Sequence, residues 1–181
     1  MRHLASGSMA LLLFATFAGP SRAATDLPRQ PPQPPPTLAS KKLLFPIQGF
    51  DLARLRDTFE ERRGMIKHEA LDILAPLGTP VLAVDDGRVA KLFRSLPGGI
   101  TIYQFDASES YSYYYAHLDR YAPGLVDGVP VKRGDVIGYV GSTGNASANA
   151  PHLHFAIFRL GTEKKWWKGE AINPFPYFAT R

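Results

Sequence analysis

The sequence predicts an all-β domain of mainly antiparallel strands, arranged as a two-layered sandwich or flattened barrel. From residue 68 onward, short apolar or alternating runs are separated by glycine and proline. Turn-forming residues such as Asp86-Gly87 and Pro97-Gly98-Gly99 stand between successive runs. No stretch between residues 71 and 160 keeps a helical period of apolar residues. The 181 residues allow one modest domain, and 45% hydrophobic residues can supply its core.

Residues 1–23 have the pattern of a secretory signal peptide. Arg2 precedes an apolar run over 10–18, and Ser21 and Ala23 are small residues at the cleavage positions. The run is about half of the roughly 20 residues that a membrane-spanning helix needs. We therefore predict a cleaved signal rather than a retained anchor. The mature protein would be exported, either periplasmic or secreted, without stable membrane insertion.

Residues 24–40 are expected to form a linker, because their prolines favour an extended polyproline conformation that cannot build a core. The folded domain would then cover 41–181. Its first element is a possible short helix near 51–57, with Leu52 and Leu55 on one side. The strands that follow are predicted at 71–74, 81–84, 88–93, 100–105, 111–116, 136–140 and 152–158.

A weak internal repeat runs through these strands. The pattern Gly-x-Pro-Val occurs at 78–81 and again at 128–131, and a glycine turn and a short apolar strand follow each copy. The repeat predicts two related hairpins that pack together in the same fold.

The composition excludes several classes of function. The absence of cysteine rules out disulfides, thiolate metal ligands, iron–sulfur clusters and a cysteine nucleophile. Removing Arg2 and Arg22 with the signal leaves 19 basic and 16 acidic residues, so the net charge falls from +5 to +3. That charge fits a loose attraction to an anionic surface such as a cell wall. No basic stripe with interleaved aromatic residues indicates nucleic-acid binding.

Four of the five histidines fall in three short motifs, which together predict a metal site. His152 and His154 would point to the same face of a strand, as would His68 and Asp72, four residues apart. Two imidazoles and one carboxylate suit tetrahedral zinc with its fourth position left for water. The two remaining histidines could accept a proton from the water and stabilise an oxyanion. Taken singly, His-x-His could be two unrelated polar positions, and His117 a core histidine among aromatic neighbours.

A helix is the alternative conformation for the first motif. His68-Glu69-x-x-Asp72 differs by one residue from the His-Glu-x-x-His motif of helical zinc proteases, in which Glu69 would be the general base. The prolines at 76 and 80 would stop such a helix, and the second histidine is missing. On a strand, Glu69 would point away from the metal.

In combination, the motifs resemble those of the lysostaphin/LytM-type zinc endopeptidases, which cut peptide cross-links of bacterial peptidoglycan. The matching segments lie between about residues 44 and 178, and they occur in the family's order: His68-x-x-x-Asp72, Ile73 to Val81, Asp86 to Val89, Tyr115-Ala116-His117-Leu118, Val140 to Asn145 and His152-Leu153-His154-Phe155.

The resemblance implies the duplicated hybrid motif fold, one zinc ion per chain and roles for five residues. His68, Asp72 and His154 would be the metal ligands, while His117 and His152 would be the catalytic histidines. Ala70 stands where many relatives have glycine, which adds a methyl group beside the metal strand but removes no ligand.

Residues that contact the substrate are harder to assign. Tyr115 and Asn145 are our candidates for substrate binding. In the run of tyrosines from 111 to 115, about half are expected to face the core. Trp166 and Trp167 could contact glycan or wall peptide, or simply cover the edge of the sheet.

The expected function is therefore hydrolysis of peptidoglycan cross-links or stem peptides by a metal-activated water. One alternative is a non-catalytic envelope factor that activates a peptidoglycan amidase, although such a factor needs no complete set of metal ligands. Another is a sugar-transport phosphocarrier domain, but the predicted signal peptide and Asp72 count against it.

Overall fold

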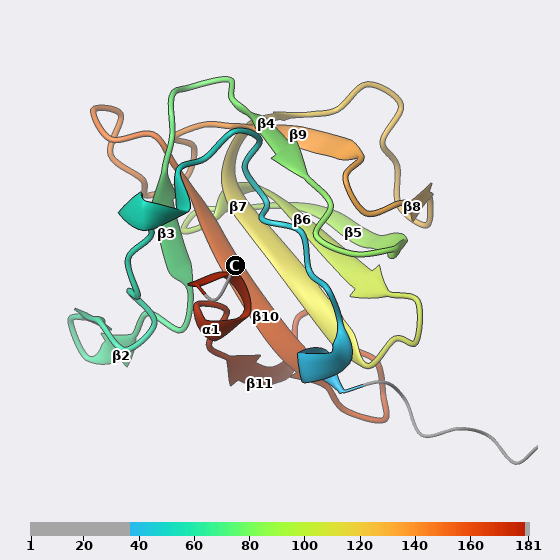
Figure 1. Cartoon of the computed structure of the whole chain (residues 1–181). Helices are drawn as coiled ribbons and strands as arrows, with labels where there is room; N and C mark the ends of the chain where they lie inside the picture. The colour runs from blue at the N-terminus through green and yellow to red at the C-terminus, as the bar shows by residue number, and fades with distance from the viewer. Residues whose placement is uncertain (1–36, 180–181) are drawn as a thin grey trace, which may run out of the picture. The chain divides into compact units, whose positions relative to one another are not determined.

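The computed structural model describes residues 37–179, so the predicted signal peptide and residues 24–36 of the predicted linker lie outside the described part (Figure 1). The last residues of the predicted linker belong to the folded unit. Leu38–Ser40 form a short 3-10 helix, η1, and Leu38 is only 3% exposed. The backbone N–H of Leu38 donates a hydrogen bond to the Tyr111 hydroxyl. Over 37–179, no helix is long and apolar enough to cross a membrane.

The fold is mainly antiparallel β-sheet with very little helix, as predicted. Each expected run carries a strand, and the predicted helix near 51–57 is a single 3-10 turn, η2 (Leu52–Arg54). A four-residue helix, α1 (Pro176–Ala179), ends the described chain. The strands are β1 (Arg62–Arg63), β2 (Ile66–Lys67), β3 (Leu71–Leu74), β4 (Pro80–Leu82), β5 (Gly87–Ser95), β6 (Gly99–Asp106), β7 (Tyr111–Tyr121), β8 (Pro130–Val131), β9 (Val136–Val140), β10 (His152–Leu160) and β11 (Gly169–Ile172).

The main sheet is built around the two long strands β7 and β10 (Figure 1). Its order is β11-β10-β7-β6-β5-β8, with β3 also paired to β10, and β9 paired to both β7 and β4. The two Gly-x-Pro-Val segments begin β4 and β8 and pair reciprocally. β4 pairs with β9 from the second copy, and β8 pairs with β5 from the first. The expectation of two separate hairpins was therefore wrong: the copies exchange partners.

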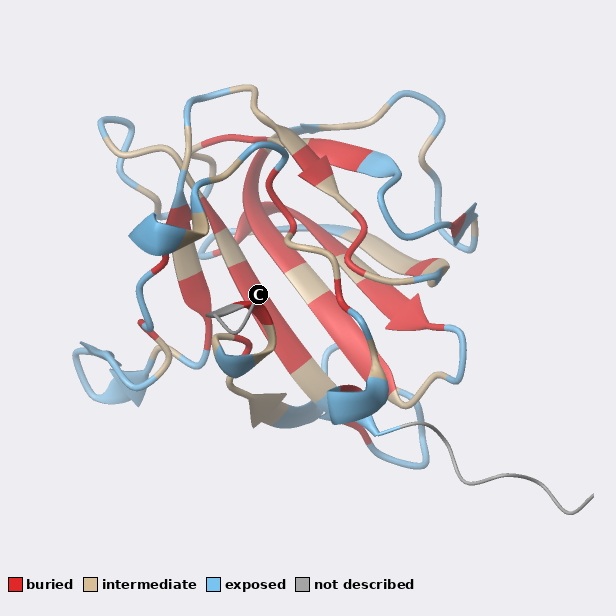
Figure 2. Ribbon diagram, viewed as in Figure 1, coloured by how far each residue is buried: buried red, intermediate tan, exposed pale blue. Residues whose placement is uncertain are grey.

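The inner face of the sheet holds the core. Tyr113 and Tyr115 of β7 and Leu153, Phe155 and Ile157 of β10 are fully buried, and they belong to the red bands of Figure 2. The segment that follows η1 and the short helix α1 cover this face. Phe178 of α1 lies 5.9 Å from Phe155 of β10, measured between ring centroids. Burying each such side chain stabilises the fold by about 1.5–3 kcal/mol, so the sheet can leave its opposite face free for the histidines.

An irregularity in β7 turns His117 to that opposite face. The register of β6 against β7 advances two residues on β6, from 100 to 102, but three on β7, from 115 to 118. His117 adopts a left-handed φ of 59°, and its backbone N–H bonds to the carbonyl of Gly98 instead of joining the regular ladder. Because a β-bulge redirects the side chains around it, Tyr115 and Leu118 both face the core while His117 does not.

Candidate metal centre

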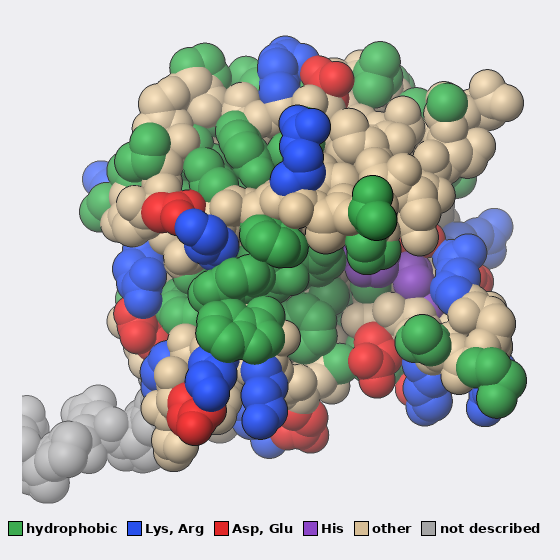
Figure 3. All heavy atoms as spheres, turned by 180° about the vertical axis from the view of Figure 1, so that it is seen from behind, with side chains coloured by type: hydrophobic (Ala, Val, Ile, Leu, Met, Phe, Trp, Pro, Cys, Tyr) green, Lys and Arg blue, Asp and Glu red, His purple; other side chains and the backbone are tan. Residues whose placement is uncertain are grey.

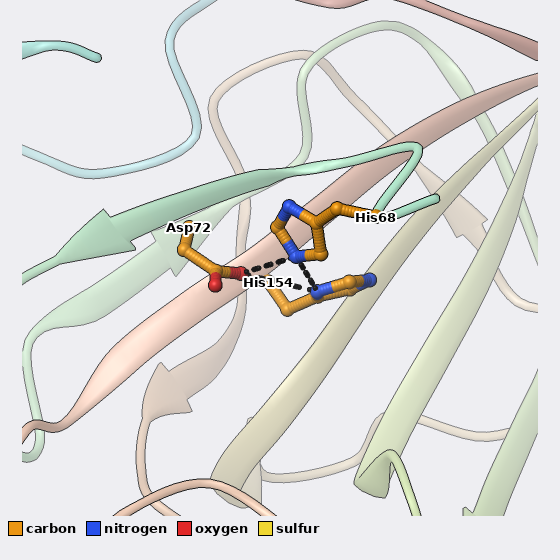
Figure 4. A group of neighbouring side chains, drawn as sticks. All are labelled: His68, Asp72 and His154. Atoms are coloured by element: carbon orange, nitrogen blue, oxygen red, sulfur yellow. Dashed lines mark hydrogen bonds and ion pairs between the residues drawn. The ribbon is translucent and has the colours of Figure 1, made fainter. Parts of the chain in front are cut away.

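Three potential metal ligands converge beside β10 (Figure 4). Asp72 Oδ1 lies 3.0 Å from His68 Nε2 and 3.1 Å from His154 Nδ1. The two histidine nitrogens are 3.1 Å apart. His154 and Asp72 face each other directly across the β3–β10 pairing. Two imidazole nitrogens and one carboxylate oxygen so close together form a donor set that suits a single zinc ion.

His68 reaches this group from outside the strand. It precedes β3, and the next residue, Glu69, has a left-handed φ of 53° that turns the chain before the strand begins. The expectation that His68 and Asp72 lie on one face of the same strand was wrong, because only Asp72 belongs to β3. Their side chains nevertheless meet. Glu69 is exposed and is not among the residues that line the cleft, in agreement with our rejection of a Glu69 base.

Backbone carbonyls orient three of the four histidines. The Nδ1 atoms of His68, His117 and His152 donate to the carbonyls of Thr58 (3.0 Å), Thr143 (2.8 Å) and Ala150 (2.9 Å), respectively. In a neutral ring with Nδ1 protonated, Nε2 carries the free lone pair. The Nε2 atom of His68 can therefore bind a metal, while His117 and His152 each keep a lone pair for another task.

His117 and His152 flank the metal-binding group. Their ring centroids are 4.9 Å apart, and that of His117 lies 5.6 Å from that of His154. His152 Nε2 is 3.7 Å from Asp72 Oδ1. The five residues expected from the sequence at the site are thus brought together, with four imidazoles around one carboxylate.

The electrostatics favour the metal-binding forms of Asp72 and His154 but oppose that of His68. Burial raises the pKa of the Asp72 carboxyl, but hydrogen bonds from His154 and His68 outweigh it and hold that pKa well below its usual value. Burial lowers the pKa of His154, and it prevails over the opposing effect of Asp72. For His68, the hydrogen bond and charge of Asp72 outweigh burial and raise the pKa. A metal competes with protons for these atoms. The low pKa of Asp72 keeps its carboxylate ionised and available to a metal.

His117 differs from the metal ligands in the cause and size of its pKa shift. It is 6% exposed, and burial is the main reason that its pKa falls to about 4. The neighbouring His154 and His152 lower it further, against the hydrogen bond to Thr143. His117 is therefore neutral near pH 7 and can accept a proton at Nε2.

The four histidines line an open cleft of about 670 Å³. Arg56, Arg63, Lys67 and residues 145–147 also line it. Arg63 forms an ion pair of 2.8 Å with Asp72 Oδ2, the carboxylate oxygen that does not face the histidines. Arg63 and Lys67 are also paired with Glu61 and Glu60, at 3.3 and 2.6 Å, so basic and acidic side chains alternate beside the cleft.

Of the two candidate substrate contacts, the structure places only Asn145 in the cleft. Tyr115 is fully buried, and its hydroxyl donates to Gln104 and accepts from the backbone N–H of Val84. Its burial is incompatible with substrate contact, so that expectation was wrong. Tyr114 lines the cleft instead. Regular alternation from His117 would place Tyr115 in the cleft, and the bulge at His117 puts Tyr114 there instead.

Sequence reasoning also missed the residues that orient the metal ligands and the two other histidines. Thr58, Thr143 and Ala150 act through backbone carbonyls, and Arg63 comes from the β1–β2 hairpin. No motif marks a backbone carbonyl, so the sequence carried no signal for the first three.

The fold and the site together define an antiparallel β domain with a His-Asp-His metal-binding group and two adjacent imidazoles in an open cleft. Residues 66–174 match the model of peptidase family M23, and the chain belongs to this family. The family is zinc-dependent, which agrees with the donor set. The lysostaphin/LytM resemblance is thereby confirmed.

Individual relatives support the assignment. The chain is 33% identical over 141 residues to the L-Ala--D-Glu endopeptidase of Bacillus subtilis, covering 74% of this chain and 42% of that protein. It is 36% identical over 129 residues to the peptidoglycan DD-endopeptidase ShyC of Vibrio cholerae, covering 68% and 29%. The chain thus spans less than half the length of these curated relatives.

Solved structures agree in fold. The catalytic domain of lysostaphin from Staphylococcus simulans superposes with a TM-score of 0.59 at 27% identity, covering 71% of this chain and 96% of that domain. A putative glycyl-glycine endopeptidase LytM from Ruminococcus gnavus superposes with a TM-score of 0.59 at 31% identity, covering 69% and 52%.

Proposed function

We propose that this protein is a zinc-dependent endopeptidase that hydrolyses peptide cross-links or stem peptides of bacterial peptidoglycan. The observation that carries the proposal is the meeting of His68, Asp72 and His154 in one cleft with the free Nε2 atoms of His117 and His152. Membership of family M23 and the endopeptidase names of the relatives support the same reaction.

His68, Asp72 and His154 would hold one zinc ion per chain. When bound, zinc polarises a carbonyl and lowers the pKa of water. The Thr58 carbonyl presents His68 Nε2 toward the shared site, and the β3–β10 pairing fixes Asp72 opposite His154.

His117 and His152 would move protons. Each ring donates a hydrogen bond from Nδ1–H to a backbone carbonyl, so the unprotonated Nε2 can take a proton from the attacking water. The ring that has accepted it becomes a donor at Nε2, able to stabilise an oxyanion or protonate the leaving amine. The depressed pKa of His117 keeps that ring neutral and ready to accept.

The place of action would be the cell envelope, because peptidoglycan lies there. We also propose that the predicted signal at 1–23 directs export and that residues 24–40 act as a spacer. Asn145 would contact the substrate peptide. The ligand is the peptide portion of peptidoglycan. The proposed reaction involves neither nucleic acid nor stable membrane insertion.

The test is mass spectrometry of fragments released from purified peptidoglycan by the mature protein, residues 24–181, loaded with zinc. Loss of cross-linked dimers with a matching gain of monomers is expected, and the fragment masses would identify the bond. Unchanged fragments from protein shown to hold zinc would overturn the proposal. The same protein would then be assayed as an activator of a purified amidase, the function of the alternative class.

A further inference from the structure

A row of aromatic side chains extends from the metal centre across the outer face of the sheet. Tyr114 lies 5.8 Å from His154 and 4.6 Å from Tyr103, measured between ring centroids. Trp166 lies 4.7 Å from Tyr103, 5.2 Å from Phe93 and 5.0 Å from Trp167. We call Phe93, Tyr103, Tyr114, Trp166 and Trp167 the aromatic platform.

The strand register places the platform on the same face as the metal ligands. Tyr114 stands two residues from Ala116, which pairs with His154, and it pairs directly with Tyr103 on β6. Paired residues share a face of the sheet, as do residues two apart on one strand. Figure 3 shows hydrophobic side chains gathered on this side of the molecule, in an area that reaches the histidines.

The platform is partly open to solvent. Trp167 is 60% exposed and Phe93 39% exposed, while Tyr103, Tyr114 and Trp166 are half-buried. The loop between β10 and β11 carries both tryptophans and folds over β6 and β5, because Trp166 contacts Tyr103 and Phe93. Trp167 contributes little cover to the sheet. A solvent-exposed group of large rings that is continuous with a reaction cleft is typical of a binding surface.

We propose that the aromatic platform binds the glycan strand of peptidoglycan by stacking against the faces of its sugar rings. This inference rests on the proposed function, since it concerns the part of that substrate that is not cut. In peptidoglycan each stem peptide is attached to a sugar. A peptide in the histidine cleft therefore leaves its glycan beside the cleft, where the platform begins at Tyr114.

The geometry favours sugar rings over an additional peptide strand. An extended peptide binds a sheet through a free strand edge, but β7 is paired on both sides with β6 and β10, and β6 with β5 and β7. The platform offers aromatic rings tilted by 36° to 74° against their neighbours, with Trp167 the most exposed, and the tyrosine hydroxyls as polar groups. Aromatic rings of this kind give contact area with little loss of conformational entropy, and the C–H face of a pyranose is a matching flat apolar surface.

The two tryptophans of the chain both belong to the platform, so intrinsic fluorescence reports on it directly. The probe is soluble glycan, strands of alternating N-acetylglucosamine and N-acetylmuramic acid from which all peptides have been removed. Titration of the full zinc-loaded protein should give a saturable change in tryptophan emission. Trp167→Ala should weaken binding by about tenfold, the order expected for one lost ring contact. Trp167→Phe should restore most of it.

The matched control is Leu77→Ala, which removes another exposed apolar side chain, 61% exposed, outside the platform. This variant should bind glycan like the wild type. Trp167→Ala should also hydrolyse a glycan-free cross-linked peptide at the wild-type rate, since it leaves the histidines untouched.

The outcomes separate this proposal from the function on which it rests. Wild-type protein that does not bind peptide-free glycan, or a Trp167→Ala variant that binds it as tightly as the wild type, would overturn the platform. So would saturation of the fluorescence change by free stem peptide alone. Glycan binding without cleavage of any cross-link or stem peptide would leave the platform standing and refute the endopeptidase.

Discussion

The carbonyl oxygen of Thr58 accepts a hydrogen bond of 3.0 Å from Nδ1 of His68, which leaves the lone pair of His68 Nε2 directed toward Asp72. The hydroxyl of the same threonine donates to the carbonyl of Ala70 at 3.1 Å and accepts from the backbone N–H of Asp72 at 3.0 Å. One residue from a preceding loop thus braces both ends of the segment that carries two metal ligands. Hydrogen bonds outside the ligand set commonly control metal affinity in this way.

We therefore predict that Thr58→Val lowers zinc affinity by about 10- to 100-fold. The substitution keeps the shape of the side chain and the carbonyl, but it leaves the Asp72 N–H and the Ala70 carbonyl without their partner. The cost in folding stability should be about 1–3 kcal/mol. Competition with a chromogenic chelator measures the affinity, and thermal unfolding of the zinc-free protein measures the stability.

The control is Thr58→Ser, which retains the hydroxyl and should keep zinc affinity near that of the wild type. If Thr58→Val binds zinc as tightly as the wild type, the bracing role is refuted. Equal weakening in both variants would point to the packing of the side chain at position 58 instead of the hydrogen bonds.

The proposed roles of the histidines separate binding from chemistry. His154→Ala should lose both the metal and the activity, because it removes one of the three ligands. His117→Ala should keep the metal and lose about 10²- to 10⁴-fold in rate, the usual contribution of a general acid–base group. Metal content by elemental analysis and cleavage of a cross-linked peptide give the two readouts. Equal loss of metal in both variants would overturn the assignment.

Acid stability should depend on Asp106 at the end of β6. This carboxylate is 1% exposed, pairs with Lys41 at 3.1 Å and accepts from the backbone N–H groups of Ser110 and Tyr111. Burial raises the pKa of Asp106, but the hydrogen bonds and Lys41 outweigh it and lower the pKa below its usual value. A group whose pKa is lower in the folded state adds stability above the unfolded pKa, near 4, and loses it as pH falls.

The free energy of unfolding should therefore fall below about pH 4. Asp106→Asn should be less stable at pH 7 by about 1–3 kcal/mol, with a weaker dependence on acid. Urea unfolding of zinc-free protein at several pH values measures both. Asp119→Asn is the comparison, since Asp119 pairs with Arg120 at the surface, where ion pairs contribute little. An unchanged acid dependence in Asp106→Asn would show that other carboxyls cause the loss.

The strands and the five site residues could be predicted because alternation and motif spacing are local in sequence. The bulge at His117 could not be predicted from the sequence, and it explains why Tyr115 was expected in the cleft where Tyr114 lies. On a regular strand Tyr115 and His117 would share a face, but the left-handed φ of His117 places them on opposite faces. The bond from the His117 N–H to Gly98, nineteen positions earlier, helps to fix this conformation, and no local pattern reports it.

Long-range contacts account for the other misses. Thr58 and Arg63 reach the metal ligands through the loop and hairpin before β3, whose path depends on the turn at Glu69. The reciprocal pairing of the two repeats likewise depends on how distant strands meet. The repeat itself was visible in the sequence, but its pairing partners were not.

The loop before β10 should control activity without controlling the metal. Gly144 has a left-handed φ of 78°, and a Cβ atom there would fall far inside contact distance of the backbone at Gly99 and Pro97. The neighbouring Thr143 carbonyl orients His117, and the Asn145 N–H donates to the Pro97 carbonyl at 3.0 Å.

Gly144→Ala must therefore push the loop away from the turn between β5 and β6, which displaces both the support of His117 and the candidate substrate contact Asn145. We expect a loss of peptide cleavage of about 100-fold or more, as misplacement of a catalytic group by about 1 Å can cause, with zinc affinity unchanged. Gly128→Ala is the matched control, because Gly128 has a similar φ of 85° but no atom within 4 Å of the added Cβ. Both variants carry the strain of a left-handed alanine, about 1–2 kcal/mol, and only Gly144→Ala adds the clash beside His117. If the two variants lose activity equally, backbone strain alone explains the effect and the loop does not position His117.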